Sequence, residues 1–180
     1  MITAPLWIWV DLEMTGLDAS QDKILEIACI ITDSNLKEKA QFGPIAISCA
    51  PQSLEKMQTW VRDIHQKSGL LDDVQKSTIT VKDAEDLFVN FLKQWVIPGQ
   101  SILCGNSIWQ DKYFLMNHMP EVLKLLHYRI LDVSSFKVAL NAWHVEDSRL
   151  PYPKKNAHRA MDDIRESIAE LKFYRENFVK

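Results

Sequence analysis

The stretch WVDLEMTGLD, residues 9–18, places two acidic residues directly after an apolar segment. Residues 6–10 have the aromatic and β-branched composition of a strand buried on both faces. Asp11 and Glu13 follow, and side chains two apart on a strand point to the same face. Two like charges beside buried apolar surface repel each other and are costly to desolvate. A hard divalent cation with oxygen ligands would relieve that cost, whereas a D-x-E motif taken alone can simply mark a solvated strand end.

The composition is that of a soluble globular protein, with 47% hydrophobic and 25% charged residues. We expect the 180 residues to form one domain, residues 1–180. A net charge of -3 without a basic block argues against a long electrostatic track for nucleic acid, so a polyanionic substrate should be short or bound through cations.

Compartment and membrane association can also be predicted from the sequence. The three cysteines, Cys29, Cys49 and Cys104, form no C-x-x-C motif, which predicts reduced, buried thiols in a cytoplasmic protein. No basic residue precedes Asp11, so no signal peptide is expected. The apolar run at 24–31 is broken by Glu26 and is too short to cross a membrane.

Apolar runs separated by turn residues predict an α/β fold. Strands are expected at 6–10, 24–32, 45–49, 101–105 and 128–132. Helices are expected at 53–68, 81–96, 110–119, 120–127, 134–143 and 161–178, with a loop at 146–156. Because the early strands have short connections, the sheet should be mixed with an antiparallel start, flanked by helices in three layers.

Two later motifs carry further acidic groups. GNSIWQD, residues 105–111, follows an expected strand and places Asp111 where open α/β sheets bind ligands. HRAMDD, residues 158–163, opens the last helix with a histidine and two acids. Taken singly, these acids can be first-turn helix residues and the histidine a capping or surface residue. Helical spacing alone does not choose between Asp162 and Asp163.

Together, the motifs resemble those of a known family. D-x-E in the first strand, an Asp after G-N-S, and H-x-x-x-x-D near the C-terminus resemble the 3'-to-5' exonucleases that use four acids and a histidine. WVDLEMTGLD, GNSIWQD, YRILDVSSFK and AHRAMDDIRESI, within residues 11–168, resemble the oligoribonuclease family. The resemblance implies a ribonuclease-H-like fold and makes His158 the general base. It implies a metal-binding set of Asp11, Glu13, Asp111 and Asp163. The match to H-x-x-x-x-D selects Asp163 over Asp162.

The resemblance also implies a reaction. Two Mg²⁺ or Mn²⁺ ions held by the four acids would support hydrolysis of very short single-stranded RNA, dinucleotides above all, to nucleoside 5'-monophosphates. Leu17 would wedge between the bases, and His65 would contact the substrate. The 5' phosphate would be capped by Ser107, Arg129, Ser134 and Lys137. Tyr128 and Arg129 would come from the partner subunit of a homodimer.

Some residues depart from the family pattern, and others fit an ordinary structural role equally well. Trp109, Lys112 and Tyr113 stand where a smaller residue and arginines are expected, which affects the local shape around Asp111 rather than the chemistry. Leu17 can be an ordinary turn residue, and Arg129 and Lys137 can simply be solvated. The tryptophans Trp7, Trp9, Trp60, Trp95 and Trp143 are expected in the core or in an interface rather than stacked on bases.

Two other functions fit parts of the sequence. One is a 3'-to-5' exonuclease that trims or proofreads longer single strands, which the low net charge and the YRILDVSS motif disfavour. The other is an inactive binding module on the same fold, which the complete set of acids and His158 disfavours. Rates on RNAs of increasing length, with and without Mg²⁺, separate the three.

Overall fold

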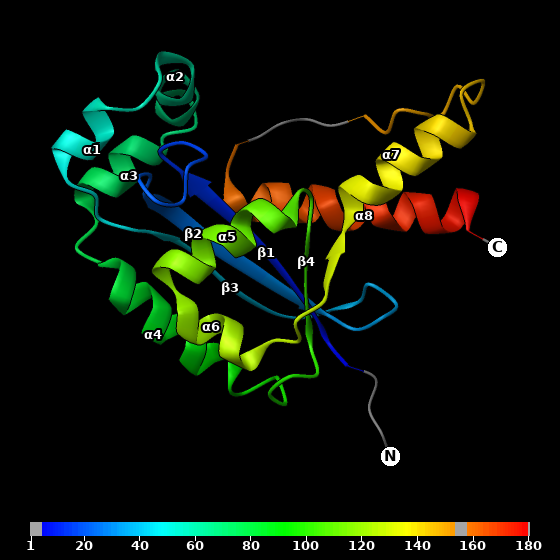
Figure 1. The fold of residues 1–180 in the computed structure, drawn as a ribbon, viewed down its shortest axis with the longest axis horizontal. Coiled ribbons are helices and arrows are strands. Elements are labelled where there is room, and N and C mark those ends of the chain that lie inside the picture. Colours follow the sequence, from blue (N-terminus) through cyan, green and yellow to red (C-terminus); the bar gives the residue numbers. More distant parts are fainter. Residues whose placement is uncertain (1–4, 154–157, 180) are drawn as a thin grey trace.

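A single mixed sheet organises the protein in the computed structural model, which describes residues 5–153 and 158–179. Within those ranges the strands are β1 (Trp7–Met14), β2 (Ile24–Thr32), β3 (Glu38–Ala46), β4 (Ile102–Gly105) and β5 (Ile130–Asp132). Their order is β3-β2-β1-β4-β5 (Figure 1). β1, β2 and β3 pair antiparallel, whereas β4 pairs parallel to β1 and to β5. The predicted mixed sheet with an antiparallel start is confirmed.

The helices form layers on both sides of this sheet. α4 (Val81–Leu92), α5 (Ile108–His118) and α6 (Pro120–Leu125) pack on one face, and α7 (Val133–Trp143) and α8 (Ala160–Phe178) on the other. α1 (Pro51–Glu55), α2 (Thr59–Lys67) and α3 (Leu70–Lys76) gather near the C-terminal end of β1 (Figure 1). In the described part of the chain, no helix is both long and apolar enough to cross a bilayer.

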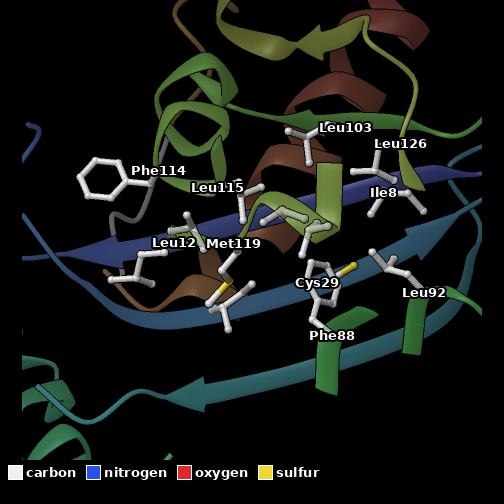
Figure 2. Close-up of a cluster of buried hydrophobic side chains, with 14 of the residues drawn as sticks. Ile8, Leu12, Cys29, Phe88, Leu92, Leu103, Phe114, Leu115, Met119 and Leu126 are labelled. Carbon is white, nitrogen blue, oxygen red and sulfur yellow. The ribbon is translucent and has the colours of Figure 1, made fainter. Parts of the chain in front are cut away.

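Alternation along β1 divides the core into two. Ile8, Val10 and Leu12 belong to the cluster under α4–α6, where Figure 2 shows side chains from the sheet meeting those from the helices. Trp9 points the other way, into the cluster under α7 and α8. Since side chains alternate along a strand, Asp11 and Glu13 share the face of Trp9, the face that α8 covers. The position of the acids therefore follows from which face of β1 is apolar.

Some predicted elements were wrong in their bounds. The third strand was predicted at 45–49, whereas β3 lies at Glu38–Ala46. The prediction was wrong because this edge strand has mostly exposed or half-buried side chains and therefore lacks an apolar run. The predicted helix at 53–68 is two helices, α1 and α2, separated by an extended Gln58, and α3 follows unpredicted. The predicted helix at 81–96 ends at Leu92, although Thr80 caps it as expected, in a reciprocal capping box with Asp83.

The first strand was predicted at 6–10, but β1 continues to Met14 and includes both Asp11 and Glu13. The other predictions agree closely with the structure. β2 has the predicted bounds, and α5–α8 begin and end within two residues of them. All three cysteines are free, as expected, but Cys49 is only partly buried. The part of the predicted loop at 154–156 lies outside the described residues.

Candidate active site

Three of the predicted acids meet between β1 and the start of α8. Asp11 and Glu13 lie on β1, and Asp163 lies in the first turn of α8. Each can offer a carboxylate oxygen such that the three oxygens lie within 4.8 Å of one another. In Figure 1 the C-terminal half of β1 approaches the beginning of the orange helix α8. Segments about 150 residues apart in the sequence thus form one acidic cluster.

The fourth acid, Asp111, approaches from the other layer. It lies in the first turn of α5, and its Oδ1 accepts a 2.9 Å hydrogen bond from the backbone N–H of Leu12. β4 pairs with β1 only as far as Trp9, so beyond that point β1 has no neighbouring strand on this side. Asp111 takes that place. It is only 6% exposed, and its side chain contacts the backbone of β1 between Asp11 and Glu13.

Burial and mutual repulsion govern the electrostatics of the four acids. Burial raises the pKa of Asp11 well above its usual range, and the charges of Asp111 and Glu13 raise it further. Burial, with the neighbouring charge of Asp163, raises the pKa of Glu13 to about 8. Burial also raises the pKa of Asp111 to about 7, although the hydrogen bond from Leu12 opposes this. Such carboxylates are costly to ionise together unless positive charge lies among them.

The donor set fits a hard divalent cation. All four side chains offer carboxylate oxygens, which are the ligands that Mg²⁺ and Mn²⁺ prefer. Asp162, the residue that helical spacing could not exclude, is exposed and lies 3.6 Å from Arg165 through Oδ1. Asp163 is the one of the two that faces Asp11 and Glu13.

A cavity of about 380 Å³ opens beside Glu13. His158 lines it, as do His65 and Trp60 of α2 and Leu17 of the loop after β1. The walls are largely apolar, and the acidic cluster lies at one side. The cavity therefore offers room for a flat, partly apolar group next to the carboxylates.

His65 is fixed in the wall of this cavity. Its Nε2 hydrogen-bonds the carbonyl oxygen of Met14 at 2.9 Å, and its Nδ1 lies 3.8 Å from Oε2 of Glu13. Burial lowers the pKa of His65, which favours the neutral ring. When Nε2–H donates to Met14, Nδ1 is an acceptor, and it has no hydrogen-bond partner among the described residues.

The predicted wedge residue, Leu17, stands out of the surface on a well-braced loop. Its side chain is 68% exposed, and its carbonyl accepts a 2.7 Å hydrogen bond from Nε2 of Gln110. Asp22 accepts hydrogen bonds from Oγ1 of Thr15 and the backbone N–H of Asp18. A Cβ at Gly16 would lie 2.4 Å from a carboxylate oxygen of Asp22, so a larger residue here would displace Asp22 from these hydrogen bonds. The bracing holds an exposed leucine beside the cavity.

The predicted phosphate-capping residues are brought together only in part. Oγ of Ser107 lies 3.1 Å from Oγ of Ser134, and both follow the C-terminal ends of their strands. Lys137 lies one turn along α7 from Ser134. Tyr128 and Arg129 precede β5, so their backbones lie at the opposite end of that strand from Ser134. The guanidinium carbon of Arg129 is 5.4 Å from the centroid of the exposed Tyr128 ring.

Two features of the site were not predicted from the sequence. Trp60 was expected in a core or interface, but its side chain is 58% exposed and lines the cavity. Nothing in the local sequence distinguishes it from Trp9, which is fully buried. Arg159 was not singled out either, although it makes several hydrogen bonds directly beside His158. Both depend on contacts between distant segments.

The fold is shared with solved exonucleases. A zinc-bound Escherichia coli ExoI–ssDNA complex aligns with a TM-score of 0.70 at 15% identity, over 98% of this chain and 41% of that one. E. coli exonuclease I in complex with a 5cy-dT13 oligonucleotide also aligns with a TM-score of 0.70, at 17% identity over 98% of this chain and 42% of that one. At these identities the likeness shows a common fold.

Sequence similarity identifies the family. The exonuclease family model, RNase_T, matches residues 8–171. The oligoribonuclease of Haemophilus ducreyi is 49% identical over 96% of this chain and 94% of its own. That of E. coli K12 is 47% identical over 96% and 95%, and the mitochondrial oligoribonuclease of mouse 47% over 96% and 73%. The chain belongs to the exonuclease family, and within it to the oligoribonucleases.

Proposed function

We propose that this protein is a 3'-to-5' exoribonuclease that hydrolyses very short RNA oligomers, preferring dinucleotides, to nucleoside 5'-monophosphates. The observation that carries the proposal is the meeting of Asp11, Glu13 and Asp163, with Asp111 beside them, next to a cavity lined by His158. Near-full-length similarity to oligoribonucleases supports it. We treat residues 1–180 as one exonuclease domain, acting in the cytoplasm, where three free cysteines stay reduced.

The four carboxylates would hold two divalent ions, Mg²⁺ or Mn²⁺. Bound there, the ions would supply the positive charge that activates water and stabilises the departing 3' oxygen. The residues would hold these ions from three separate elements: Asp11 and Glu13 from β1, Asp111 from α5 and Asp163 from α8. The relative positions of these elements would therefore determine where the scissile phosphate binds.

His158 would act as the general base. It lines the same cavity as Glu13, so a water beside the phosphate lies within its reach. An imidazole ring nitrogen can accept the proton of that water, and His65 cannot take the place of His158, because one ring nitrogen of His65 is engaged with Met14 and burial lowers the pKa of His65. His65 would instead contact the substrate as part of the cavity wall.

The shape of the site supports a short substrate. The cavity of about 380 Å³ suits one terminal nucleoside, with Trp60 offering a stacking face and Leu17 standing where a second base would follow. The Ser107–Ser134 pair would donate hydrogen bonds to a 5' phosphate, with Lys137 nearby. A net charge of -3 offers little to a longer polyanion. Trimming of longer strands is the alternative.

We also infer a homodimer formed through α7. Phe136, Val138 and Trp143 are exposed there, and Trp143 is 74% exposed. Two shallow apolar cavities meet at Phe136 and Val179 on this side of the molecule. Burying such a surface is favourable. In the dimer, Tyr128 and Arg129 of one protomer would complete the phosphate cap of the other.

A length series tests the proposal. We expect the rate on a 5'-phosphorylated dinucleotide to exceed the rate on a twenty-residue RNA by more than about tenfold, a difference of about 1.4 kcal/mol in transition-state stabilisation. Excess chelator should abolish the reaction. Equal rates on both lengths would favour a trimming exonuclease, and full activity in chelator would rule out the metal mechanism.

The dimer has its own test. Trp143→Glu should shift the protein to a monomer in sedimentation velocity and lower activity on the dinucleotide, because the partner's cap residues are lost. Asn90→Glu, at an exposed position of α4 outside the α7 surface, adds the same single negative charge and is the charge-matched control. A fully active monomer would contradict the shared cap.

A further inference from the structure

We propose that Arg159 is a positioning residue that ties the start of α8, and with it His158, both to β2 and to the α2–α3 wall of the cavity. The inference uses the proposed function only to say which reaction this link serves. Its physical basis is a set of hydrogen bonds around one buried carboxylate, that of Glu26.

Glu26 anchors Arg159 to the sheet. It lies in β2 opposite Glu13 of β1, and it is fully buried. Its Oε2 accepts hydrogen bonds from Nη2 of Arg159 at 2.7 Å and from Nε at 3.2 Å. Its Oε1 accepts one from the backbone N–H of Ala160 at 3.0 Å. A buried carboxylate is tolerated only when paired and hydrogen-bonded, so these contacts give the start of α8 a defined place over the sheet.

The same guanidinium reaches the wall of the cavity. Nη1 donates to the carbonyl of Ser68, which ends α2, at 3.2 Å, and Nη2 donates to Oδ2 of Asp73 in α3 at 3.0 Å. α2 carries Trp60 and His65 into the cavity. Arginine suits this role because its planar group presents five N–H donors in a fixed geometry, which the single ammonium of lysine cannot match.

This link bears on His158 because the two residues are adjacent. His158 has a left-handed backbone with φ of 52°, a conformation that non-glycine residues rarely adopt without support. Immediately after it, Arg159 and Ala160 are both hydrogen-bonded to Glu26. Cutting the link would let the backbone at His158 relax and would free the wall to move away from it.

The two anchors predict different kinetic effects. Loss of both anchors in Arg159→Met should lower kcat on a 5'-phosphorylated diadenylate by about tenfold to a hundredfold, since a misplacement of about 1 Å has effects of that size. Asp73→Asn weakens only the outer anchor, because it removes the charge on Asp73 and leaves the Glu26 anchor intact, so it should leave kcat within about twofold and raise KM several-fold. In Arg159→Lys the shorter ammonium group contacts only Glu26 and not the outer anchor, so its kcat should lie between those of Arg159→Met and the parent.

A readout that needs no activity tests the link itself. In hydrogen–deuterium exchange, Arg159→Met should speed exchange both in the first turn of α8 and across α2, two segments far apart in the sequence. Arg165→Met removes an arginine from the outer surface of the same helix, 3.6 Å from Asp162, and should change neither segment. Circular dichroism and thermal unfolding establish that each variant is folded at the assay temperature.

The outcomes separate this inference from the proposed function. If Arg159→Met is folded and both its exchange and its kcat match the parent, Arg159 is not a positioning residue. If Arg159→Met does not fold, Arg159→Lys and Asp73→Asn decide, and parental kinetics and exchange in both would overturn the inference. If the parent hydrolyses no dinucleotide, the proposed function fails, while the exchange experiment still judges the link.

Discussion

The two faces of β1 show how one strand serves stability on one side and chemistry on the other. Toward α4–α6 it presents Ile8, Val10 and Leu12, all at most 5% exposed within an apolar cluster. Toward α8 it presents Trp9 and then Asp11 and Glu13, whose pKa values are raised by burial. Burial stabilises the first set and penalises the ionised form of the second. Substitutions on the acidic face should therefore lower turnover and raise stability, whereas substitutions on the apolar face should lower stability and leave turnover nearly unchanged.

The largest expected effect is on the acidic face. Asp11→Asn keeps the shape of the side chain and removes one charge, so it should lower turnover of a dinucleotide by at least about a thousandfold. In metal-free protein it should raise the unfolding temperature, because repulsion with Asp111 and Glu13 is relieved. Activity assays and differential scanning calorimetry in chelator measure the two effects. A near-normal rate would contradict the assigned role of Asp11.

On the apolar face, a substitution should lower stability and leave kcat nearly unchanged. Phe88 of α4, labelled in Figure 2, is fully buried. Its ring stacks on that of Phe42, with ring centroids 4.9 Å apart. Phe88→Ala should lower the free energy of unfolding by about 3 kcal/mol, because it leaves a cavity in the core. At a temperature where the variant is folded, kcat should stay within about twofold of the parent, since the acids lie on the other face. A large loss of kcat without loss of stability would mean that the two faces are not independent.

A substitution at His158 distinguishes a general base from a metal ligand. His158→Ala should lower kcat by about a hundredfold, the usual contribution of a general base, and leave Mn²⁺ affinity nearly unchanged. Calorimetric titration with Mn²⁺ measures the affinity separately from turnover. If affinity falls and kcat follows it, His158 is a ligand rather than the base.

The smallest expected effect is the pH dependence of stability. The pKa of Glu13 is raised from 4.5 to about 8, so between these values the folded protein binds more protons than the unfolded chain. Metal-free protein should therefore be most stable near about pH 5 and lose on the order of 2 kcal/mol toward about pH 8. Urea unfolding at several pH values measures this. The dependence should be much weaker in Glu13→Gln, which removes the titrating carboxyl group, and stability that rises over this window would contradict the raised pKa.

The fold was predictable from the sequence where the apolar pattern is strong. β2 is an apolar run, interrupted by Glu26 and ending at Thr32, that is buried along its whole length, and its bounds were predicted correctly. β3 is an edge strand with mostly exposed or half-buried side chains, so its pattern is weak and its position was wrong. α3 was missed because Gly69, read as the end of a helix, is also the left-handed link to the next one.

The sequence alone indicated which acidic residues are candidates for the site, but it did not predict that they lie close together in the folded protein. Periodicity alone places Asp11 and Glu13 on one face, but it cannot say that Asp163 covers that face or that Asp111 occupies the place left where β4 ends. Those positions came from the family resemblance. The exposed Trp60 and the Arg159–Glu26 contact escaped sequence reasoning because each depends on segments far apart in the chain.

The most direct test of the account is a crystal soaked with Mn²⁺ and a dinucleotide, analysed by anomalous scattering. We predict two ions about 4 Å apart, as in other two-metal phosphodiester sites, coordinated by Asp11, Glu13, Asp111 and Asp163, with the phosphate between these acids and His158. Ions bound away from Asp163, or a nucleotide bound outside the cavity at Glu13, would contradict it.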